Sequence, residues 1–143
     1  MKRTYSLDDC QLIELPQHQD RAGNLTAINN GIDLPQRIER VFYLYDVPTG
    51  ADRGGHAHRN LFQYIIAASG SFEVLLDDGS CKRRVLLNRP HQALLVTPWV
   101  WSQLVNFSGG AIAMVLATMP YNESDYLRDY NDFIQLRHGN HTI

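Results

Sequence analysis

The chain has 143 residues, enough for one domain with one hydrophobic core, and its 44% apolar and 20% charged residues are ordinary values for a globular protein. The formal net charge of −2 shows no electrostatic signature of binding to nucleic acid or to an anionic membrane. No apolar run approaches the roughly 20 residues that a transmembrane helix needs.

The N-terminal residues carry no targeting signal that we recognise. Lys2 and Arg3 are followed by Leu7-Asp8-Asp9 rather than by an apolar stretch, so we expect no secretory signal and a cytoplasmic location. Cys10 and Cys81 form no Cys-x-x-Cys motif. Both are expected to be reduced and structural.

Turn-forming Gly, Asn, Asp and Pro residues recur along the chain and separate short apolar or alternating segments. The clearest of these segments are 41–45, 62–66, 72–76, 93–96 and 113–116. Many short strands at regular spacing are typical of an all-β sandwich or barrel. Asp77-Asp78-Gly79 predicts a hairpin between a strand ending at Leu76 and one starting near Cys81. No linker or repeat divides the chain, so residues 1–143 are expected to form one domain.

Only the C-terminal end shows helical spacing of its apolar residues. These residues are Leu127, Tyr130, Phe133 and Ile134, and Asn122 is a suitable N-cap before them. We therefore expect a short C-terminal α-helix packed against the barrel. Arg128 and Asp129 are expected to hold this helix in place rather than to belong to a site.

The most informative motif is Gly55-His56-Ala57-His58, because two histidines one residue apart project from the same face of a strand. With Gln63 and Gly70 after it, the motif resembles the first signature of a cupin barrel, with Gln63 where the metal-binding pattern has Glu. The best match to the second signature, Pro-x-Gly-x-x-His, is 98–103. It has Val100 in place of Gly and Gln103 in place of His.

The altered signatures argue against a metal centre. Two imidazoles and two neutral amides, with no carboxylate, make a poor site for a divalent metal. We expect no metal and no other cofactor. Imidazoles that bind no metal can instead transfer protons near neutral pH.

Four segments in order extend the resemblance along nearly the whole chain: 40–48, 53–58, 76–79 and 125–130. Together they resemble the nucleotide-sugar 3,4-ketoisomerases, the WxcM-like family of cupins. The resemblance implies an all-β, cupin-type double-stranded β-helix (jelly roll) with a short C-terminal α-helix. It also implies a metal-free homodimer with exchanged N-terminal strands, and here the stretch through Ile28 is expected to pair with a partner's sheet edge. The implied reaction converts dTDP-4-keto-6-deoxy-D-glucose into a 3-keto isomer, for 3-amino-3,6-dideoxy sugars of surface polysaccharides such as O-antigens and S-layer glycans.

The residues suit this chemistry. The carbonyl of a 4-keto sugar acidifies the hydrogen on C3, and a base can remove it to form an enediolate that is reprotonated at C4. By the family's motif, His56 and His58 are the catalytic pair, and we favour His58 as the C3 base and His56 as the shuttle. Tyr43, on the same strand face as Tyr45, could hydrogen-bond the developing oxyanion.

Further residues are candidates for substrate binding. Arg53 could hold a diphosphate oxygen through its planar fork of donors, and Gln63 could face the sugar. Asn24, Ser102 and Gln103 are the positions where we look for control over the face of C4 reprotonation, which sets the galacto or gluco configuration. Trp99 and Trp101 are expected to pack in the core or at its rim.

Three alternatives stay open at this point. A dTDP-sugar 3,5-epimerase-like cupin would also remove protons beside the C4 ketone, but it would exchange hydrogen at C3 and C5 and retain that ketone. A non-catalytic sugar-binding cupin would need no base, so the retention of both His56 and His58 argues against it. A metal-dependent dioxygenase is weaker, because Gln63 and Gln103 replace two expected ligands.

Overall fold

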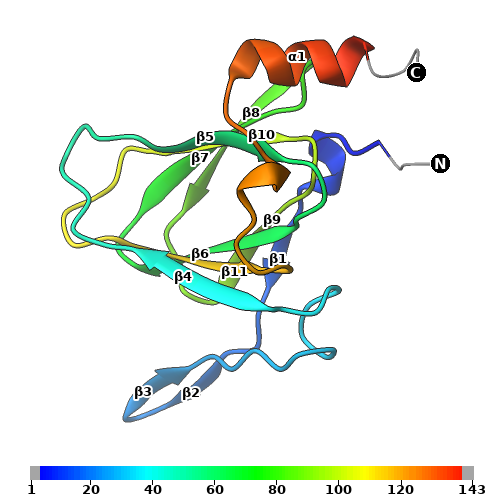
Figure 1. The fold of residues 1–143 in the computed structure, drawn as a ribbon. Coiled ribbons are helices and arrows are strands. Elements are labelled where there is room, and N and C mark those ends of the chain that lie inside the picture. The colour runs from blue at the N-terminus through cyan, green and yellow to red at the C-terminus, as the bar shows by residue number, and fades with distance from the viewer. Residues whose placement is uncertain (1–3, 140–143) are drawn as a thin grey trace.

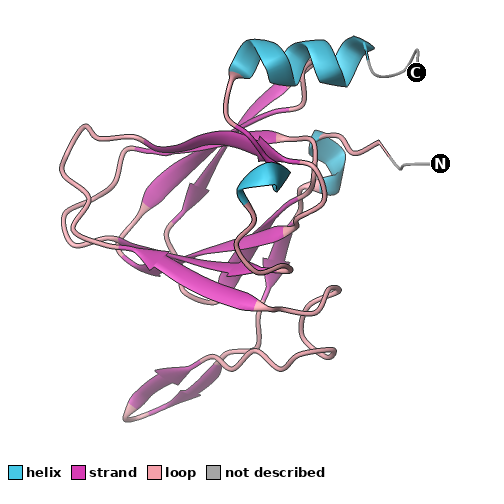
Figure 2. Cartoon of the chain, viewed as in Figure 1, coloured by secondary structure: helices cyan, strands magenta, loops and turns pink. Residues whose placement is uncertain are grey.

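Two five-stranded antiparallel sheets lie face to face in the structure, a computed structural model that describes residues 4–139 (Figures 1 and 2). The first sheet has the order β1 (Leu12–Glu14), β9 (Gln92–Val96), β6 (Gln63–Ser69), β11 (Ile112–Ala117) and β4 (Arg40–Leu44). The second has the order β12 (Tyr126–Leu127), β5 (Arg53–His58), β10 (Trp101–Val105), β7 (Phe72–Asp77) and β8 (Lys82–Leu87). This is the predicted cupin-type jelly roll, and all five segments predicted as strands are strands.

The main core fills the space between the sheets. β7 shows the cause: Phe72, Val74 and Leu76 point inward and are buried, while the residues between them are only partly covered. Ile65 of β6 meets them from the other sheet. Side chains that alternate along a strand place one apolar set in the core, and each large buried side chain contributes about 1.5–3 kcal/mol to folding.

A second apolar layer covers the outer face of the first sheet. Tyr64 and Ile66 of β6 point outward, where they pack with Leu34, Ile28 and Ile38 from the segment that precedes β4. β6 is therefore buried on both faces. This explains why its sequence is continuously apolar instead of alternating.

The C-terminal helix α1 (Tyr130–Gly139) covers part of the outer face of the second sheet, where Phe133 packs with Ala57 and Leu127 (Figure 1). Its predicted start is corrected. Asn122 caps a separate 3-10 helix, η2 (Glu123–Asp125), through Ser124 N–H, and Leu127 lies in β12. The first turn of α1 is capped instead by Asp129, which accepts from Asp132 N–H at 3.0 Å.

The predicted hairpin joins β7 to β8. The carboxylate of Asp77 accepts from Gly79 N–H, and Gly79 has a φ of +89°, a conformation that favours glycine. Cys81 follows this turn and is exposed, so the expected structural role holds only for Cys10, which is buried; both cysteines are free.

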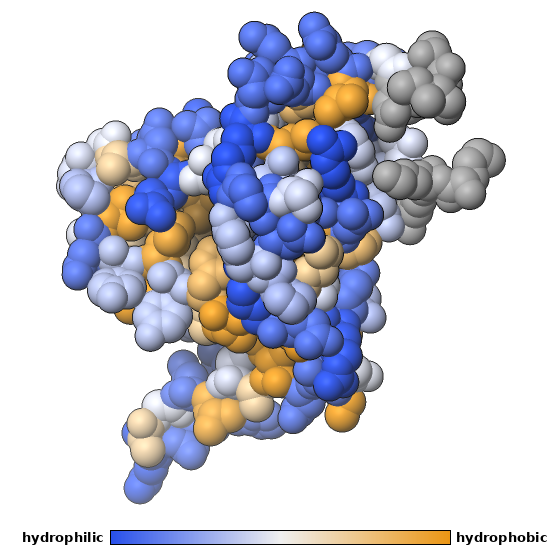
Figure 3. Space-filling view, viewed as in Figure 1, coloured by the Kyte–Doolittle hydropathy of each residue, from blue (hydrophilic) through white to orange (hydrophobic). Residues whose placement is uncertain are grey.

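The N-terminal part divides into three pieces. A 3-10 helix η1 (Leu7–Asp9) and β1 belong to the barrel, whereas β2 (His18–Asp20) and β3 (Gly23–Leu25) form an exposed hairpin that stands apart from it (Figure 1). The space-filling view shows apolar residues in the middle of the molecule, between the two sheets, framed by hydrophilic residues (Figure 3). Within residues 4–139, no helix is both long enough and apolar enough to span a membrane.

Candidate active site

The two histidines of β5 lie side by side inside the barrel. Their ring centroids are 4.9 Å apart and the rings are nearly perpendicular, at 83°. Ala57, between them, faces the other way and packs under α1. The expectation that His56 and His58 share one strand face is confirmed.

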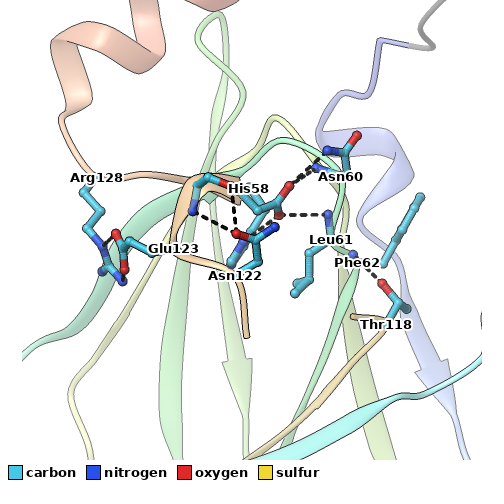
Figure 4. Close-up of polar contacts among 10 residues, drawn as sticks. His58, Asn60, Leu61, Phe62, Thr118, Asn122, Glu123 and Arg128 are labelled. Atoms are coloured by element: carbon cyan, nitrogen blue, oxygen red, sulfur yellow. Dashed lines mark hydrogen bonds and ion pairs between the residues drawn. The ribbon is translucent and has the colours of Figure 1, made fainter. Parts of the chain in front are cut away.

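A buried carboxylate holds His58. Asp125 Oδ2 lies 3.2 Å from His58 Nδ1 and also accepts from Leu61 N–H at 3.2 Å, while Oδ1 accepts from Asn60 N–H at 2.9 Å and Asn60 Nδ2 at 3.1 Å (Figure 4). Two backbone N–H groups and a side-chain amide all donate to this carboxylate. As a hydrogen-bond acceptor, Asp125 faces Nδ1–H of His58, which leaves Nε2 as the basic nitrogen.

The segment that carries Asp125 runs along the histidine strand. β12 pairs antiparallel with β5, with Tyr126 opposite His58 and Leu127 opposite Ala57. Arg59 N–H donates to the carbonyl of Asp125 at 2.9 Å. The backbone pairing thus fixes the position of Asp125 next to a residue 67 positions earlier in the chain.

Tyr126 contacts both imidazoles. Its ring centroid lies 4.3 Å from that of His58 and 5.0 Å from that of His56. The Arg128 guanidinium lies 4.1 Å above the Tyr126 ring and makes two hydrogen bonds to Glu123, at 2.7 and 2.9 Å (Figure 4). The expectation that Arg128 only holds the C-terminal helix is corrected: its side chain lines the cavity described next.

A cavity of about 490 Å³ opens beside His56. Its polar lining comes from Asp52, Arg53, His56, Gln63, Ser102, Tyr126 and Arg128. Its apolar lining includes Phe42, Leu44, Ile65, Leu104 and Val115. Two guanidinium groups, a carboxylate and several hydrogen-bonding groups thus line the cavity together with apolar side chains, an arrangement that suits a small polar ligand. His58 contacts the lining residues His56 and Tyr126 and is only 4% exposed.

Both imidazoles are neutral near pH 7. The pKa of His56 is lowered to about 4, first by burial and then by the neighbouring His58 and Arg128. Burial also lowers the pKa of His58, against the opposing effect of Asp125. A neutral imidazole is the form that can accept a proton from carbon.

Three of the candidate binding residues predicted from sequence lie at the cavity. Arg53 begins β5, Gln63 begins β6, and Ser102 pairs with His56 across the second sheet. Gln63 and Ser102 are buried, and Arg53 is exposed at the mouth.

Three other candidates do not reach the cavity. Tyr43 is 60% exposed on the outer side of β4, because Phe42 and Leu44 take the inward positions, and it packs with Tyr45 at 5.7 Å. Gln103 follows the inward-facing Ser102 and points outward, where it donates to Asp52 at 3.1 Å. Asn24 lies on the exposed β2–β3 hairpin. Tyr43 therefore does not line the cavity of its own subunit.

The sequence reasoning missed the roles of Asp125 and Tyr126. Its only signal for them was the match of 125–130 to a family segment, which gave no role to either residue. Their proximity to the histidines arises from the β5–β12 pairing, which is a long-range contact.

Comparison with known proteins identifies close relatives. The family model FdtA, described as WxcM-like, C-terminal, matches residues 8–138. A TDP-4-oxo-6-deoxy-alpha-D-glucose-3,4-oxoisomerase from Aneurinibacillus thermoaerophilus is 40% identical over 114 residues, covering 80% of this chain and 82% of that protein.

Solved structures agree with this match. QdtA, a sugar 3,4-ketoisomerase from Thermoanaerobacterium thermosaccharolyticum in complex with TDP, is 33% identical with a TM-score of 0.91, covering 94% of this chain and 98% of that one. A histidine-to-asparagine mutant of QdtA in complex with TDP-4-keto-6-deoxyglucose is similar, with 33% identity, a TM-score of 0.88 and coverage of 90% and 94%.

Proposed function

Because the chain belongs to the FdtA family of WxcM-like, C-terminal proteins, we propose that it isomerises TDP-4-keto-6-deoxy-D-glucose to the corresponding 3-keto sugar. The observation that carries this proposal is the pair of neutral imidazoles, 4.9 Å apart, beside a cavity with a cationic rim. Its relatives at 33–40% identity are 3,4-ketoisomerases, which favours this reaction over a 3,5-epimerisation.

In the reaction that we propose, His58 is the base. Its Nε2 takes the proton from C3, and the C3–H electron pair forms the C3–C4 double bond while negative charge moves to the C4 oxygen. Asp125 keeps the Nδ1 proton in place and stabilises the imidazolium that forms. His56 then carries the proton of the C3 hydroxyl to the C4 oxygen. The His58 imidazolium gives its proton to C4, which leaves the ketone at C3 and returns His58 to its neutral form.

Tyr126 takes the role that the sequence suggested for Tyr43. Its ring contacts both histidines and lines the cavity, so its hydroxyl is the tyrosine donor available to the enediolate in this subunit. Arg53 remains the candidate for binding the diphosphate, and Arg128 supplies a second guanidinium on the same wall.

We propose that no metal takes part. The donors at the position of a cupin metal site are His56, His58 and Gln63, and Gln103 points to the opposite face of its strand. Among the residues that the structure describes, no three or more His, Cys, Asp or Glu side chains are grouped so as to hold a metal ion. Two imidazoles with one neutral amide bind divalent metals weakly.

We also propose that residues 1–143 act as one domain within a homodimer that exchanges N-terminal strands. The β2–β3 hairpin is exposed on every residue and stands apart from the barrel, so it is available to a partner (Figure 1). In such a dimer Asn24 would reach the partner's site, where it and Ser102 would influence the face of C4 reprotonation.

The test is incubation of the purified protein with TDP-4-keto-6-deoxyglucose in D₂O, followed by NMR of the sugar. We expect the ketone to move from C4 to C3 and deuterium to enter at C4 of the product and, through the reverse reaction, at C3 of the remaining substrate. Exchange at C3 and C5 with the C4 ketone retained would identify an epimerase. No exchange at any carbon would identify a binding protein.

A further inference from the structure

Trp99 has an unusual backbone conformation directly beside the active site. Its φ of +65° lies in the left-handed region, which bulky side chains rarely adopt because it strains the backbone. Elsewhere in residues 4–139 the non-glycine residues with positive φ are Asp46 and Asn106, types that tolerate this region. The surrounding structure must therefore hold Trp99 in place.

Three sets of contacts hold Trp99 in this conformation: those of its N–H group, of its carbonyl and of its indole ring. Trp99 N–H donates to the backbone carbonyl of His58 at 2.8 Å. Its own carbonyl accepts from Arg137 Nη1 at 2.6 Å. The indole is 9% exposed and packs with Ala57, Leu127 and Phe133.

Arg137 lies in the last turn of α1 and joins distant parts of the chain. Its guanidinium donates to the carbonyl of Trp99 through one nitrogen and to the carbonyl of Tyr5 through another. The side chain is only partly exposed, so its charge loses hydration that these carbonyls replace. The Arg137 guanidinium, a charged group that is costly to bury, thus connects α1 to Trp99, the residue whose N–H binds the His58 carbonyl.

We propose that Arg137 is a positioning residue for the isomerisation, acting through Trp99 on His58. This inference rests on the proposed function. Asp125 orients the imidazole of His58, and Trp99 fixes the backbone from which that imidazole projects. A displacement of about 1 Å caused by a distant change can cost about 10²-fold in rate.

The kinetic test replaces Arg137 with methionine, which keeps an unbranched apolar stem and removes both donors. We expect kcat to fall by about 10- to 100-fold with KM within about twofold of wild type, because no cavity residue changes. Arg137→Lys restores one donor and is expected to recover part of kcat. His138→Ala is the matched control, since it removes a contact from the same helical turn to Gly79 O and should leave kcat unchanged.

A second readout does not depend on turnover. Imidazole ¹⁵N NMR of the protein without substrate, with His58 assigned by its loss in His58→Asn, reports whether the proton stays on Nδ1. We expect Arg137→Met to shift the His58 signals and His138→Ala to leave them unchanged. If wild-type protein shows no isomerisation, the proposed function fails while this readout still tests the positioning.

Either of two results would overturn the proposal. One is a folded Arg137→Met protein with wild-type kcat and wild-type His58 signals. The other is a loss of kcat that equals the unfolded fraction from thermal melting in both Arg137 variants, because that would make the contact merely structural.

Discussion

Replacing Asp125 with asparagine tests the arrangement around His58 most directly. The carboxylate accepts four hydrogen bonds, two on each oxygen, and the variant keeps the size of the side chain. An amide nitrogen cannot accept a hydrogen bond, so with the amide oxygen toward Asn60 the bond from Leu61 N–H is lost, and a bond to His58 forms only with the amide as the donor. A bond to a charged acceptor contributes about 1.5–3 kcal/mol, so we expect the free energy of unfolding to fall by about 3 kcal/mol.

The effect on activity follows from the tautomer of His58. With the amide oxygen toward Asn60, the amide NH₂ faces His58 Nδ1 and donates to it. The imidazole proton then moves to Nε2, which can no longer accept a proton from C3. Loss of the base is expected to lower kcat by about 10²- to 10⁴-fold.

The assay is the rate of ketone transfer in D₂O by NMR, with urea unfolding measured on the same preparations. Asp129→Asn is the matched control, because Asp129 is exposed, caps α1, and asparagine caps equally well. A folded Asp125→Asn protein with a near wild-type rate would show that Asp125 does not control His58.

Four further predictions concern the histidines, the pH dependence, the metal requirement and the assembly. The folded His58→Asn protein should lose hydrogen exchange at C3, whereas His56→Asn should retain this exchange and form product slowly. We expect turnover of each variant to fall by about 10²- to 10⁴-fold. Wild-type rates in both variants would refute the mechanism. Because the proton-accepting form of His56 is neutral and its pKa is lowered to about 4, kcat/KM should stay level from pH 7 to about 5 and fall as pH drops through about 4, and a fall centred near 6.5 would contradict this. Chelator treatment should leave the rate unchanged, whereas a loss restored by Zn, Fe or Mn would indicate a metal enzyme. Light scattering at micromolar concentration should give a dimer, and a monomer would count against strand exchange.

Local patterns in the chain were enough to predict several of the strands, including β7 and its hairpin with β8. Alternation placed Phe72, Val74 and Leu76 on one face, and the turn at Asp78-Gly79 set the hairpin. The helix start was misplaced because Asn122 has suitable cap chemistry, and it does cap a turn, but a short strand intervenes before α1. A cap preference is local and does not show which helix follows it.

Local spacing likewise predicted one part of the active site and not another. The spacing of His56 and His58 determined that both face one side of a strand, because the side-chain period of a strand is two. The same period explains the position of Tyr43: parity with Tyr45 places the two tyrosines on one face, but it does not say which face of β4 is the inner one.

The sequence by itself therefore determined several of the strands, the histidine pair and the altered cupin signature, all of which depend on neighbours within a few residues. Only the tertiary structure decided that Asp125 and Tyr126 lie against the histidines, that Gln103 points away, and that Arg137 connects α1 to Trp99. The physical reason is that these contacts join residues far apart in the chain. Strand pairing and the packing of α1 on the second sheet bring them together, and no local spacing encodes that arrangement.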